Sequence, residues 1–463
     1  MSTHNYNQKY LYFVVFVSAL GGLLFGYDWV VIGGAKPFYE KFFAIADIPS
    51  LQGWAMSSAL LGCLLGAVLS GLLSDRFGRK RLLILAAVLF IISAYGTGAS
   101  NSFNMFIFFR IFGGLGIGLA SNLSPMYIAE IAPKTMRGKL VSINQFTIVI
   151  GILLAQFVNW QIADTVPVNF TDTEILASWN GQMGWRWMFW MELIPAILFM
   201  LFMFIVPESP RWLAKNGFPE KVKRILSKVG GKEYANDEFN NIQASLLNEK
   251  GKVNFRYLFS PGMKKVLIIG VVLAVFQQWC GINVIFNYAE EVFEAAGYGV
   301  SDILFNILIT GSVNLIFTIV AIYTVDKWGR RALMLMGSGG LAGIYLFMGL
   351  AYYLNITGWP LLLLTLLAIA CYAMSLAPVT WVLLSEIFPN RIRGAAMAVS
   401  TVALWLACFL LTYTFPLLNN LLNASGTFWL YGIICILGFI FILKTLPETK
   451  GKSLETIEKE IIN

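Results

Sequence analysis

The stretch SDRFGRKR at residues 74–81 returns in altered form as VDKWGRRA at residues 325–332. Both copies contain the pattern D-x-x-G-R, and both follow a long uncharged run. Two more pairs repeat in the same order: EIAPKTMRG (130–138) with EIFPNRIRG (386–394), and PESPRW (207–212) with PETKGK (447–452). Three repeats in one order predict a parallel duplication, whose two halves enclose a binding site at their interface.

Long uncharged runs make up most of the chain. Its 463 residues are 58% hydrophobic and 13% charged, with a mean hydropathy of +0.71. Soluble proteins carry about 25% charged residues, so this composition is typical of an integral membrane protein. Because about 20 apolar residues cross a bilayer as a helix, the runs predict twelve spans, six in each half. The runs 332–385 and 394–443 are each long enough for two spans.

The basic residues lie on alternate connections between these spans. If the N-terminus is cytoplasmic, all of the 33 Lys and Arg fall in inner segments except Lys36, Lys41, Arg110 and Arg186. The positive-inside rule therefore predicts that both termini are cytoplasmic. This distribution also accounts for the net charge of +8 without nucleic acid as a partner.

A polar inner segment separates the halves. PEKVKRILSKVGG (219–231) has apolar residues at helical spacing and ends in two glycines. NDEFNNIQASLLNEK (236–250) again has apolar residues at helical spacing. Both predict short amphipathic helices lying against the membrane bundle. The fold class is thus an all-α membrane protein of two six-helix halves. We predict an N-terminal half at 1–206, a cytoplasmic helical linker at 207–263, a C-terminal half at 264–446 and a cytoplasmic tail at 447–463.

Several patterns argue against other classes of protein. GGLGIG (113–118) lies inside a span and has no preceding strand, so Gly114 and Gly118 indicate a close helix–helix contact, not a nucleotide loop. The five cysteines lie in apolar stretches without a CxxC pair, which favours small buried hydrophobes over a metal site or disulfides. We expect no cofactor, no metal and no enzymatic activity, because no nucleophile–base pair stands out.

The repeated motifs, with PESPRWL (207–213), FQQWCGIN (276–283) and PETKGKS (447–453), make the chain resemble the sugar porters of the major facilitator superfamily from about Tyr10 to Lys452. Bacterial proton–xylose and proton–hexose symporters are the most similar members, and facilitative glucose transporters are more distant. The resemblance implies the twelve-helix major facilitator fold and a monomer in the bacterial inner membrane. It also implies alternating access, with a monosaccharide and a proton as ligands.

Polar residues inside the spans are the candidates for the sugar site. Clustered amides supply donors and acceptors for a polyol, and Trp faces suit the C–H side of a sugar ring. The alternatives are amides that only bond neighbouring helices, and Trp side chains that anchor at the lipid interface. By resemblance, the sugar-binding positions are Gln145, Gln277, Gln278, Asn283, Asn314, Trp381 and Trp405.

The match to the family is incomplete. Ile152 stands where xylose symporters carry a second Gln in the fifth span, although glucose facilitators also have Ile there. Leu404 stands where an amide is common, and Asn287 replaces a Tyr. These differences leave the identity of the sugar open, between a pentose and a hexose.

Three ionisable residues inside spans are the candidates for proton coupling. Asp28 and Arg110 lie at matching depths from the outer ends of the first and fourth spans, so they can pair. Glu192 is the one acid in the sixth span. By resemblance all three positions are charged in proton symporters, and facilitators lack both acids. We therefore predict symport, with passive uniport, a structural Asp28–Arg110 salt bridge and a non-transporting sugar sensor as alternatives.

Charged residues at the inner helix ends recur in both halves. Isolated surface ion pairs contribute little, but a network between the halves can bias which side of the site is open. The family uses these positions as a cytoplasmic latch. The residues concerned are Asp75, Arg79, Glu130, Arg137, Glu208, Asp326, Arg330, Glu386, Arg393 and Glu448.

Overall fold

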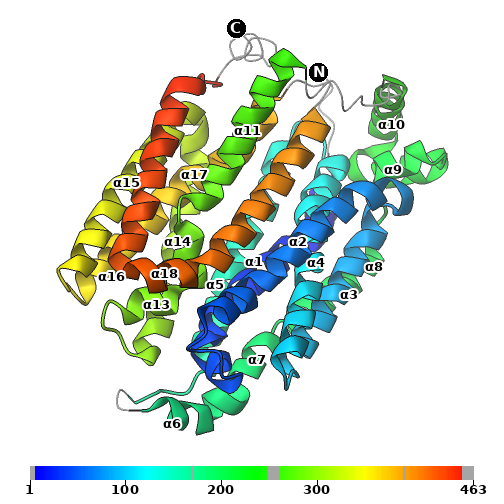
Figure 1. Cartoon of the computed structure of the whole chain (residues 1–463). Coiled ribbons are helices and arrows are strands. Elements are labelled where there is room, and N and C mark those ends of the chain that lie inside the picture. Colours follow the sequence, from blue (N-terminus) through cyan, green and yellow to red (C-terminus); the bar gives the residue numbers. More distant parts are fainter. Residues whose placement is uncertain (1–5, 168–169, 249–259, 389–392, 451–463) are drawn as a thin grey trace.

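The computed structural model describes residues 6–167, 170–248, 260–388 and 393–450, and its described elements are helices arranged as a bundle (Figure 1). The elements of the N-terminal half are α1 (Gln8–Phe42), α2 (Pro49–Phe77), α3 (Arg79–Gly98), α4 (Phe103–Ile131), α5 (Arg137–Ile162), α6 (Asp172–Ala177), the π-helix η1 (Asn180–Gly184), α7 (Trp185–Trp190) and α8 (Leu193–Ile205). The connecting helices are α9 (Pro210–Lys215) and α10 (Pro219–Asn248).

The helices of the C-terminal half are also interrupted in places. They are α11 (Pro261–Trp279), α12 (Ile282–Asn287), α13 (Ala289–Glu294), α14 (Val300–Trp328), α15 (Arg330–Tyr353), α16 (Trp359–Met374), α17 (Leu376–Ile387) and α18 (Arg393–Thr445). Among the described residues, eleven helical segments are long and apolar enough to cross a membrane. The last of them spans 52 residues and turns at Asn423, which has a φ of 57°, so it holds two of the twelve predicted spans.

Other spans are broken where the sequence alone predicts one helix. The seventh span divides into α11 and α12 at Gly281, whose φ of 86° is left-handed. A side chain there would also meet the Tyr431 ring, since its Cβ would lie 2.8 Å from the ring. The tenth span divides at Ser375, three residues before Pro378. A break in a membrane-spanning helix leaves backbone N–H and C=O groups without helical partners. In transporters such groups lie near the centre of the bundle.

Close glycine contacts hold α2 against α4. A Cβ on Gly114 would lie 1.8 Å from the backbone oxygen of Ala59, and one on Gly118 would lie 2.3 Å from that of Cys63. The backbones can approach this closely only because both residues lack a side chain. The prediction that GGLGIG forms a helix–helix contact is therefore confirmed.

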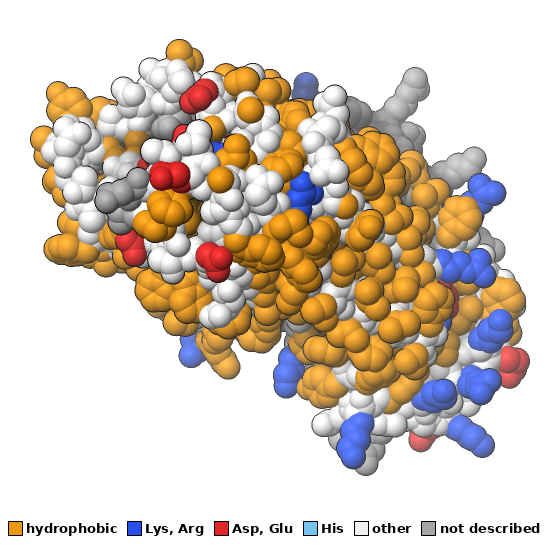
Figure 2. Space-filling model, turned by 90° about the horizontal axis from the view of Figure 1, so that it is seen from below, with side chains coloured by type: hydrophobic (Ala, Val, Ile, Leu, Met, Phe, Trp, Pro, Cys, Tyr) orange, Lys and Arg blue, Asp and Glu red, His pale blue; other side chains and the backbone are white. Residues whose placement is uncertain are grey.

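The surface of the bundle is apolar, and its charges gather at the ends. Leu72, Tyr323 and Trp359 are each 70% or more exposed. Figure 2 shows hydrophobic side chains over most of the visible surface, with most of the visible Lys and Arg on the side that carries α9 and α10 in Figure 1. In lipid such exposure carries no cost, because hydrocarbon is as apolar as these side chains.

The connecting segment forms the predicted pair of amphipathic helices. Helix α10 is interrupted by non-helical backbone at Gly230 and Gly231. Its apolar residues Val222, Leu226 and Val229 are at most 1% exposed. The segment contacts the start of α1, because the Asn7 backbone N–H donates to the Val229 oxygen at 2.8 Å.

A methyl group at Gly114 should destabilise the N-terminal half. Gly114→Ala overpacks the α2–α4 contact, and overpacking costs about 1–3 kcal/mol. We expect a lower temperature of unfolding in detergent. Gly343→Ala is the matched control, because a Cβ at that position meets nothing within 4 Å. Equal melting of the two variants would show that α2 and α4 can separate without cost.

Candidate functional site

A buried ion pair joins α1 to α4 inside the N-terminal half. An Arg110 guanidinium nitrogen donates to Asp28 Oδ1, and another donates to the Asp28 backbone oxygen at 3.3 Å. The Asp28 side chain is 0% exposed and that of Arg110 is 2% exposed. Neighbouring Gly113 has no side chain that could hinder this approach, since a Cβ there would lie 2.5 Å from Asp28 Oδ2. The predicted pairing of Asp28 with Arg110 is present in the structure.

Glu192 lies next to this pair in an interruption between α7 and α8. It is 1% exposed, and both of its carboxylate oxygens lack a hydrogen-bond partner among the described residues. Asp28 and Arg110 are close enough to act on it electrostatically. Asp28 Oδ2 and Arg110 Nε also have unused hydrogen-bonding capacity in the described structure. Two buried carboxylates therefore lie near one arginine, and only Asp28 is bonded to it.

The amides of the seventh span form a chain of hydrogen bonds in the C-terminal half. Asn283 Nδ2 donates to Gln278 Oε1 at 2.5 Å, and Gln278 Nε2 donates to Gln277 Oε1 at 2.5 Å. Gln277 Nε2 donates to the Tyr372 hydroxyl at 2.7 Å. The break at Gly281 brings Asn283 of α12 back toward Gln278 of α11. The predicted amide cluster thus exists, and Tyr372 of α16 is a member that the sequence analysis missed.

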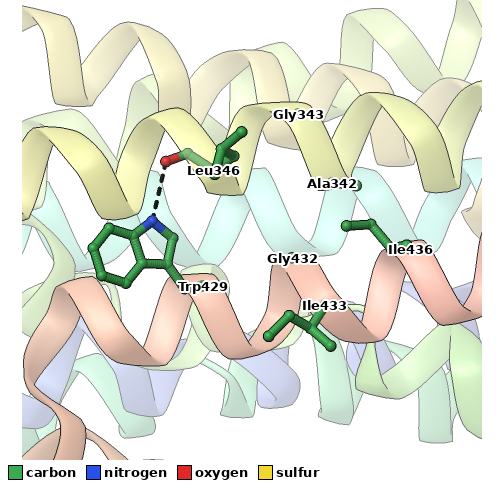
Figure 3. Close-up of a pocket in the computed structure, with 7 residues that line it drawn as sticks. All are labelled: Ala342, Gly343, Leu346, Trp429, Gly432, Ile433 and Ile436. Atoms are coloured by element: carbon green, nitrogen blue, oxygen red, sulfur yellow. Dashed lines mark hydrogen bonds between the residues drawn. The ribbon is translucent and has the colours of Figure 1, made fainter.

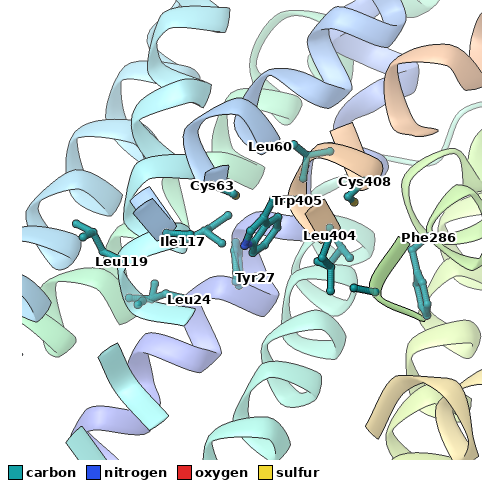
Figure 4. Close-up of a cluster of buried hydrophobic side chains, with 14 of the residues drawn as sticks. Leu24, Tyr27, Leu60, Cys63, Ile117, Leu119, Phe286, Leu404, Trp405 and Cys408 are labelled. Atoms are coloured by element: carbon teal, nitrogen blue, oxygen red, sulfur yellow. The ribbon is translucent and has the colours of Figure 1, made fainter. Parts of the chain in front are cut away.

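Trp405 lies between the two halves. Its ring centroid is 6.1 Å from those of Phe25 and Trp29 on α1, and its Nε1 has no hydrogen-bond partner among the described residues. Figure 4 shows it among buried side chains of the N-terminal half, including Tyr27 and Ile117. The sequence analysis missed Phe25 and Trp29. Their closeness to Asp28 in the sequence was a usable signal, because all three residues lie within about one turn of the same helix.

The remaining predicted sugar-site residues take no part in these contacts. Asn314 on α14 is buried at 7% exposure. Gln145 on α5 is exposed, and Trp381 on α17 is 38% exposed. No contact between described residues links Gln145 or Trp381 to the amide chain. Their assignment to the sugar site stays a prediction.

The inner charges of the N-terminal half form one cluster. Arg79 bonds Glu130 at 2.9 Å and Asp75 at 3.4 Å, and Asp75 also accepts from Lys215 Nζ at 2.7 Å. Glu208 accepts from the Arg79 backbone N–H at 3.0 Å. Gly78 makes this possible, because a Cβ there would lie 2.3 Å from Glu208 Oε2. The glycine of D-x-x-G-R therefore leaves room for an acid that caps the next helix.

The C-terminal half repeats this arrangement. Arg330 bonds Glu386 at 3.1 Å, and its backbone N–H donates to Glu448 at 2.9 Å. Gly329 leaves room for Glu448 as Gly78 does for Glu208. Burial raises the pKa of Glu448, but donation from four backbone N–H groups outweighs it and holds that pKa below its usual value.

The predicted latch residues behave differently from a network between the halves. None of the bridges named above between described residues joins the N-terminal half to the C-terminal half. Arg137 begins α5 and lies half-buried. The side chains of Asp326 and Arg393 lie outside the described part of the structure. In this conformation the inner charges therefore brace the helix ends of each half separately.

A groove on the surface of the bundle lies apart from the ion pairs and the amide chain described above. It has a volume of about 440 Å³ between α15 and α18, and its lining is apolar (Figure 3). Trp429 Nε1 donates to the Leu346 oxygen there at 3.3 Å. None of the predicted site residues lines it. A hydroxylated ligand would leave its polar groups unpaired in this groove, so it is not the sugar site.

These features define a polytopic membrane transporter, and the chain belongs to the sugar (and other) transporter family, whose model matches residues 14–461. The D-xylose-proton symporter of Escherichia coli K12 is 42% identical, with 98% of this chain and 96% of that protein covered. The arabinose-proton symporter of Bacillus subtilis is 37% identical, with 99% and 96% covered. The predicted family and twelve-helix fold are confirmed.

Solved structures of the E. coli xylose transporter match the whole bundle. Its inward-open form gives a TM-score of 0.84 at 41% identity, with 97% of this chain and 100% of that one covered. The form bound to 6-bromo-6-deoxy-D-glucose gives 0.80 at 42% identity, with 98% and 100% covered.

Removal of Arg110 should destabilise the protein, and removal of its partner should restore part of the loss. Arg110→Leu leaves two acids without their shared cation, and breaking a buried pair costs about 3–5 kcal/mol. Asp28→Asn in the same chain removes one of those acids. We expect Arg110→Leu alone to unfold at a lower temperature than the double variant Arg110→Leu with Asp28→Asn. Arg81→Leu, at an exposed position, is the matched control. If the double variant melts no higher than Arg110→Leu, the pair is not what stabilises this site.

Proposed function

We propose that this protein imports a monosaccharide together with a proton by alternating access, across a bacterial inner membrane with both termini cytoplasmic. The observation that carries the proposal is the Asp28–Arg110 pair beside the unpartnered Glu192. A passive carrier does not need a second buried acid next to an ion pair. Ionisable groups buried in a membrane protein are costly and mark proton pathways.

In the proposed cycle Asp28 is the coupling carboxylate. While ionised, it holds Arg110. A proton from the outside neutralises Asp28 and releases Arg110, which can then turn toward Glu192. The contact of Asp28 with α4 weakens in that step, and the loaded carrier changes conformation. A nearby second acid lowers the cost of the step, because Arg110 never loses all of its partners.

The sugar site is proposed at the interface between the halves. Gln277, Gln278 and Asn283 supply hydroxyl partners, and Trp405 supplies a flat face. Trp405 also touches Trp29, which follows Asp28 directly in α1. This contact gives a short route from the proton site to the sugar site. Relatives named for xylose, arabinose and glucose support a pentose or hexose as the substrate.

The proposed latch uses the inner clusters. In the inward-facing form each cluster is satisfied within its own half, as the bridges described above are. When the inner side closes, the two clusters approach each other, and their charges can exchange partners across the interface. Two matching arrays of acids and arginines suit such an exchange, because each array carries both signs of charge.

Removal of the Gln277 side chain should weaken sugar binding. In Gln277→Ala a ligand hydroxyl loses a buried hydrogen bond, which costs about 1–3 kcal/mol, or roughly five- to a hundredfold in affinity. Calorimetry with xylose and glucose on purified protein measures the loss. Gln243→Ala, exposed on α10, is the matched control. Unchanged affinity in Gln277→Ala would place the sugar elsewhere.

Asp28→Asn should abolish uphill uptake while sugar binding persists. One proton moving down 100 mV supplies about 2.3 kcal/mol, which supports roughly fiftyfold accumulation. The Asn side chain cannot release a proton, so the variant loses this drive. Uptake of labelled sugar into proteoliposomes, with and without a proton gradient, is the measurement. Asp302→Asn, exposed on α14, is the matched control.

Two other outcomes would revise the mechanism. Proton-driven accumulation by Asp28→Asn would move the coupling role to Glu192. A wild-type protein that only equilibrates sugar, whatever the gradient, would be a passive uniporter.

A further inference from the structure

A second buried charge cluster lies beyond Asp28 toward the outer end of α1. Lys36 follows Asp28 by eight residues and is 2% exposed. Its ammonium group lies 3.1 Å from a Glu40 oxygen, 3.1 Å from Glu290 and 2.9 Å from Glu291. The mechanism proposed above uses none of these four residues.

This cluster joins the two halves. Lys36 and Glu40 belong to α1 of the N-terminal half, and Glu290 and Glu291 belong to α13 of the C-terminal half. The backbones are also close here, since a Cβ on Gly33 would lie 3.1 Å from the Phe286 oxygen at the end of α12. The described inner bridges hold each half separately, whereas Lys36 holds one half to the other.

Other polar groups surround the cluster on the elements packed against it. Gln52 of α2 donates to Glu40 at 3.0 Å, and Tyr288 donates to the Thr412 oxygen of α18 at 2.6 Å. The further titratable groups next to it are Tyr39 of α1 and Glu294 of α13, and Lys41 of α1 and Asp172 of α6 act in turn on Glu294. Lys41 bonds the exposed Asp172 at 3.4 Å.

The charges of the cluster do not balance. Three carboxylates face one ammonium group, and the buried oxygens Glu40 Oε1 and Glu291 Oε2 have no partner among the described residues. Burial of excess negative charge is costly unless protons neutralise it. If α13 moved away from α1, water would reach the carboxylates and they could ionise freely. The closed arrangement therefore binds protons more tightly than an open one.

We propose that Lys36, Glu40, Glu290 and Glu291 form an outer latch that holds the outer side of the carrier closed, and that external protons favour its closure. The proposal rests on alternating access as proposed above. It adds a proton-sensitive step on the outer side, separate from Asp28. An acidic exterior would then assist the loaded carrier in turning inward.

The direction of the pH effect follows from Glu291. Burial raises its pKa to about 8, with Lys36 opposing and Glu290 adding to the rise. The pKa of an unperturbed glutamate is about 4.3. A group whose pKa is raised in the closed form stabilises that form fully below the ordinary value, and the contribution is lost as the pH rises through about 8. Alkaline conditions outside should therefore open the latch.

A cysteine reporter can measure opening without any transport. Asn287→Cys places a thiol at the end of α12, where the native side chain is 4% exposed. In intact cells, a membrane-impermeant maleimide labels this thiol only when the outer side opens. Because the assay needs neither sugar nor a proton gradient, its result stands even if the chain proves to be a uniporter or does not transport. The chain without the reporter gives the background from native cysteines.

Lys36→Met in the reporter chain should open the outer side. We expect labelling to become at least about tenfold faster at external pH 6.5. Lys41→Met is the matched control and should label as the parent does, because Lys41 bonds Asp172 within the same half. Labelling of Lys36→Met at the parent rate would overturn the latch.

Glu291→Gln tests the pH dependence of labelling. It also provides a second test of the outer latch if Lys36→Met fails to fold. The parent should label faster at external pH 9 than at pH 6.5. The neutral glutamine should keep labelling slow at both values, as a permanently protonated acid would. Glu294→Gln is the control, because Glu294 is exposed on the same helix, and it should keep the parent's response. A Glu291→Gln chain with the parent's full pH dependence would overturn the role of protons.

Discussion

A charge inside a membrane protein needs a partner, because neither lipid nor a dry protein interior can solvate it. That constraint explains why the ionisable residues deep in the N-terminal half occur together. Asp28 has Arg110, and Arg110 is also within electrostatic reach of Glu192. The surrounding fold serves this grouping: Gly113 allows the close approach, and the interruption between α7 and α8 places Glu192 in the bundle. The group contains two acids and one arginine, and in the proposed mechanism one proton decides which acid pairs with the arginine.

The duplicated halves have kept the same inner ends but have diverged at the centre. Gly78 with Glu208 and Gly329 with Glu448 are the same structural device, an acid that caps a helix through space left by a glycine. At the level of the binding site the halves differ, because the N-terminal half contains the ion pair and the C-terminal half contains the amide chain. In the proposed mechanism, coupling between proton and sugar therefore crosses the interface. The contact between Trp29 and Trp405 lies at this crossing.

The two ends of the bundle use their ion pairs differently. On the inner side the described bridges of Arg79 and of Arg330 stay within one half, and on the outer side Lys36 bridges the halves. This pattern agrees with the TM-score of 0.84 to an inward-open relative, since a carrier open to the inside is closed on the outside. The presence of charged residues in the sequence therefore does not tell which conformational state a carrier adopts. The same residues can bond within a half or between halves.

The sequence by itself determined the class of protein and most of its layout. Apolar run length gives the spans, because a bilayer has a fixed thickness, and the repeated motifs give the two halves. It also placed Asp28 and Arg110 at matching depth, which is a property of position along a helix. Tertiary structure alone decided the rest. Tyr372 joins the amide chain, Trp29 meets Trp405, and Lys36 meets Glu290, although each pair is far apart in the chain or on different helices. Such contacts depend on helix rotation and on local breaks such as that at Gly281. Helix rotation and breaks follow from packing against neighbours, which hydrophobic run length does not encode.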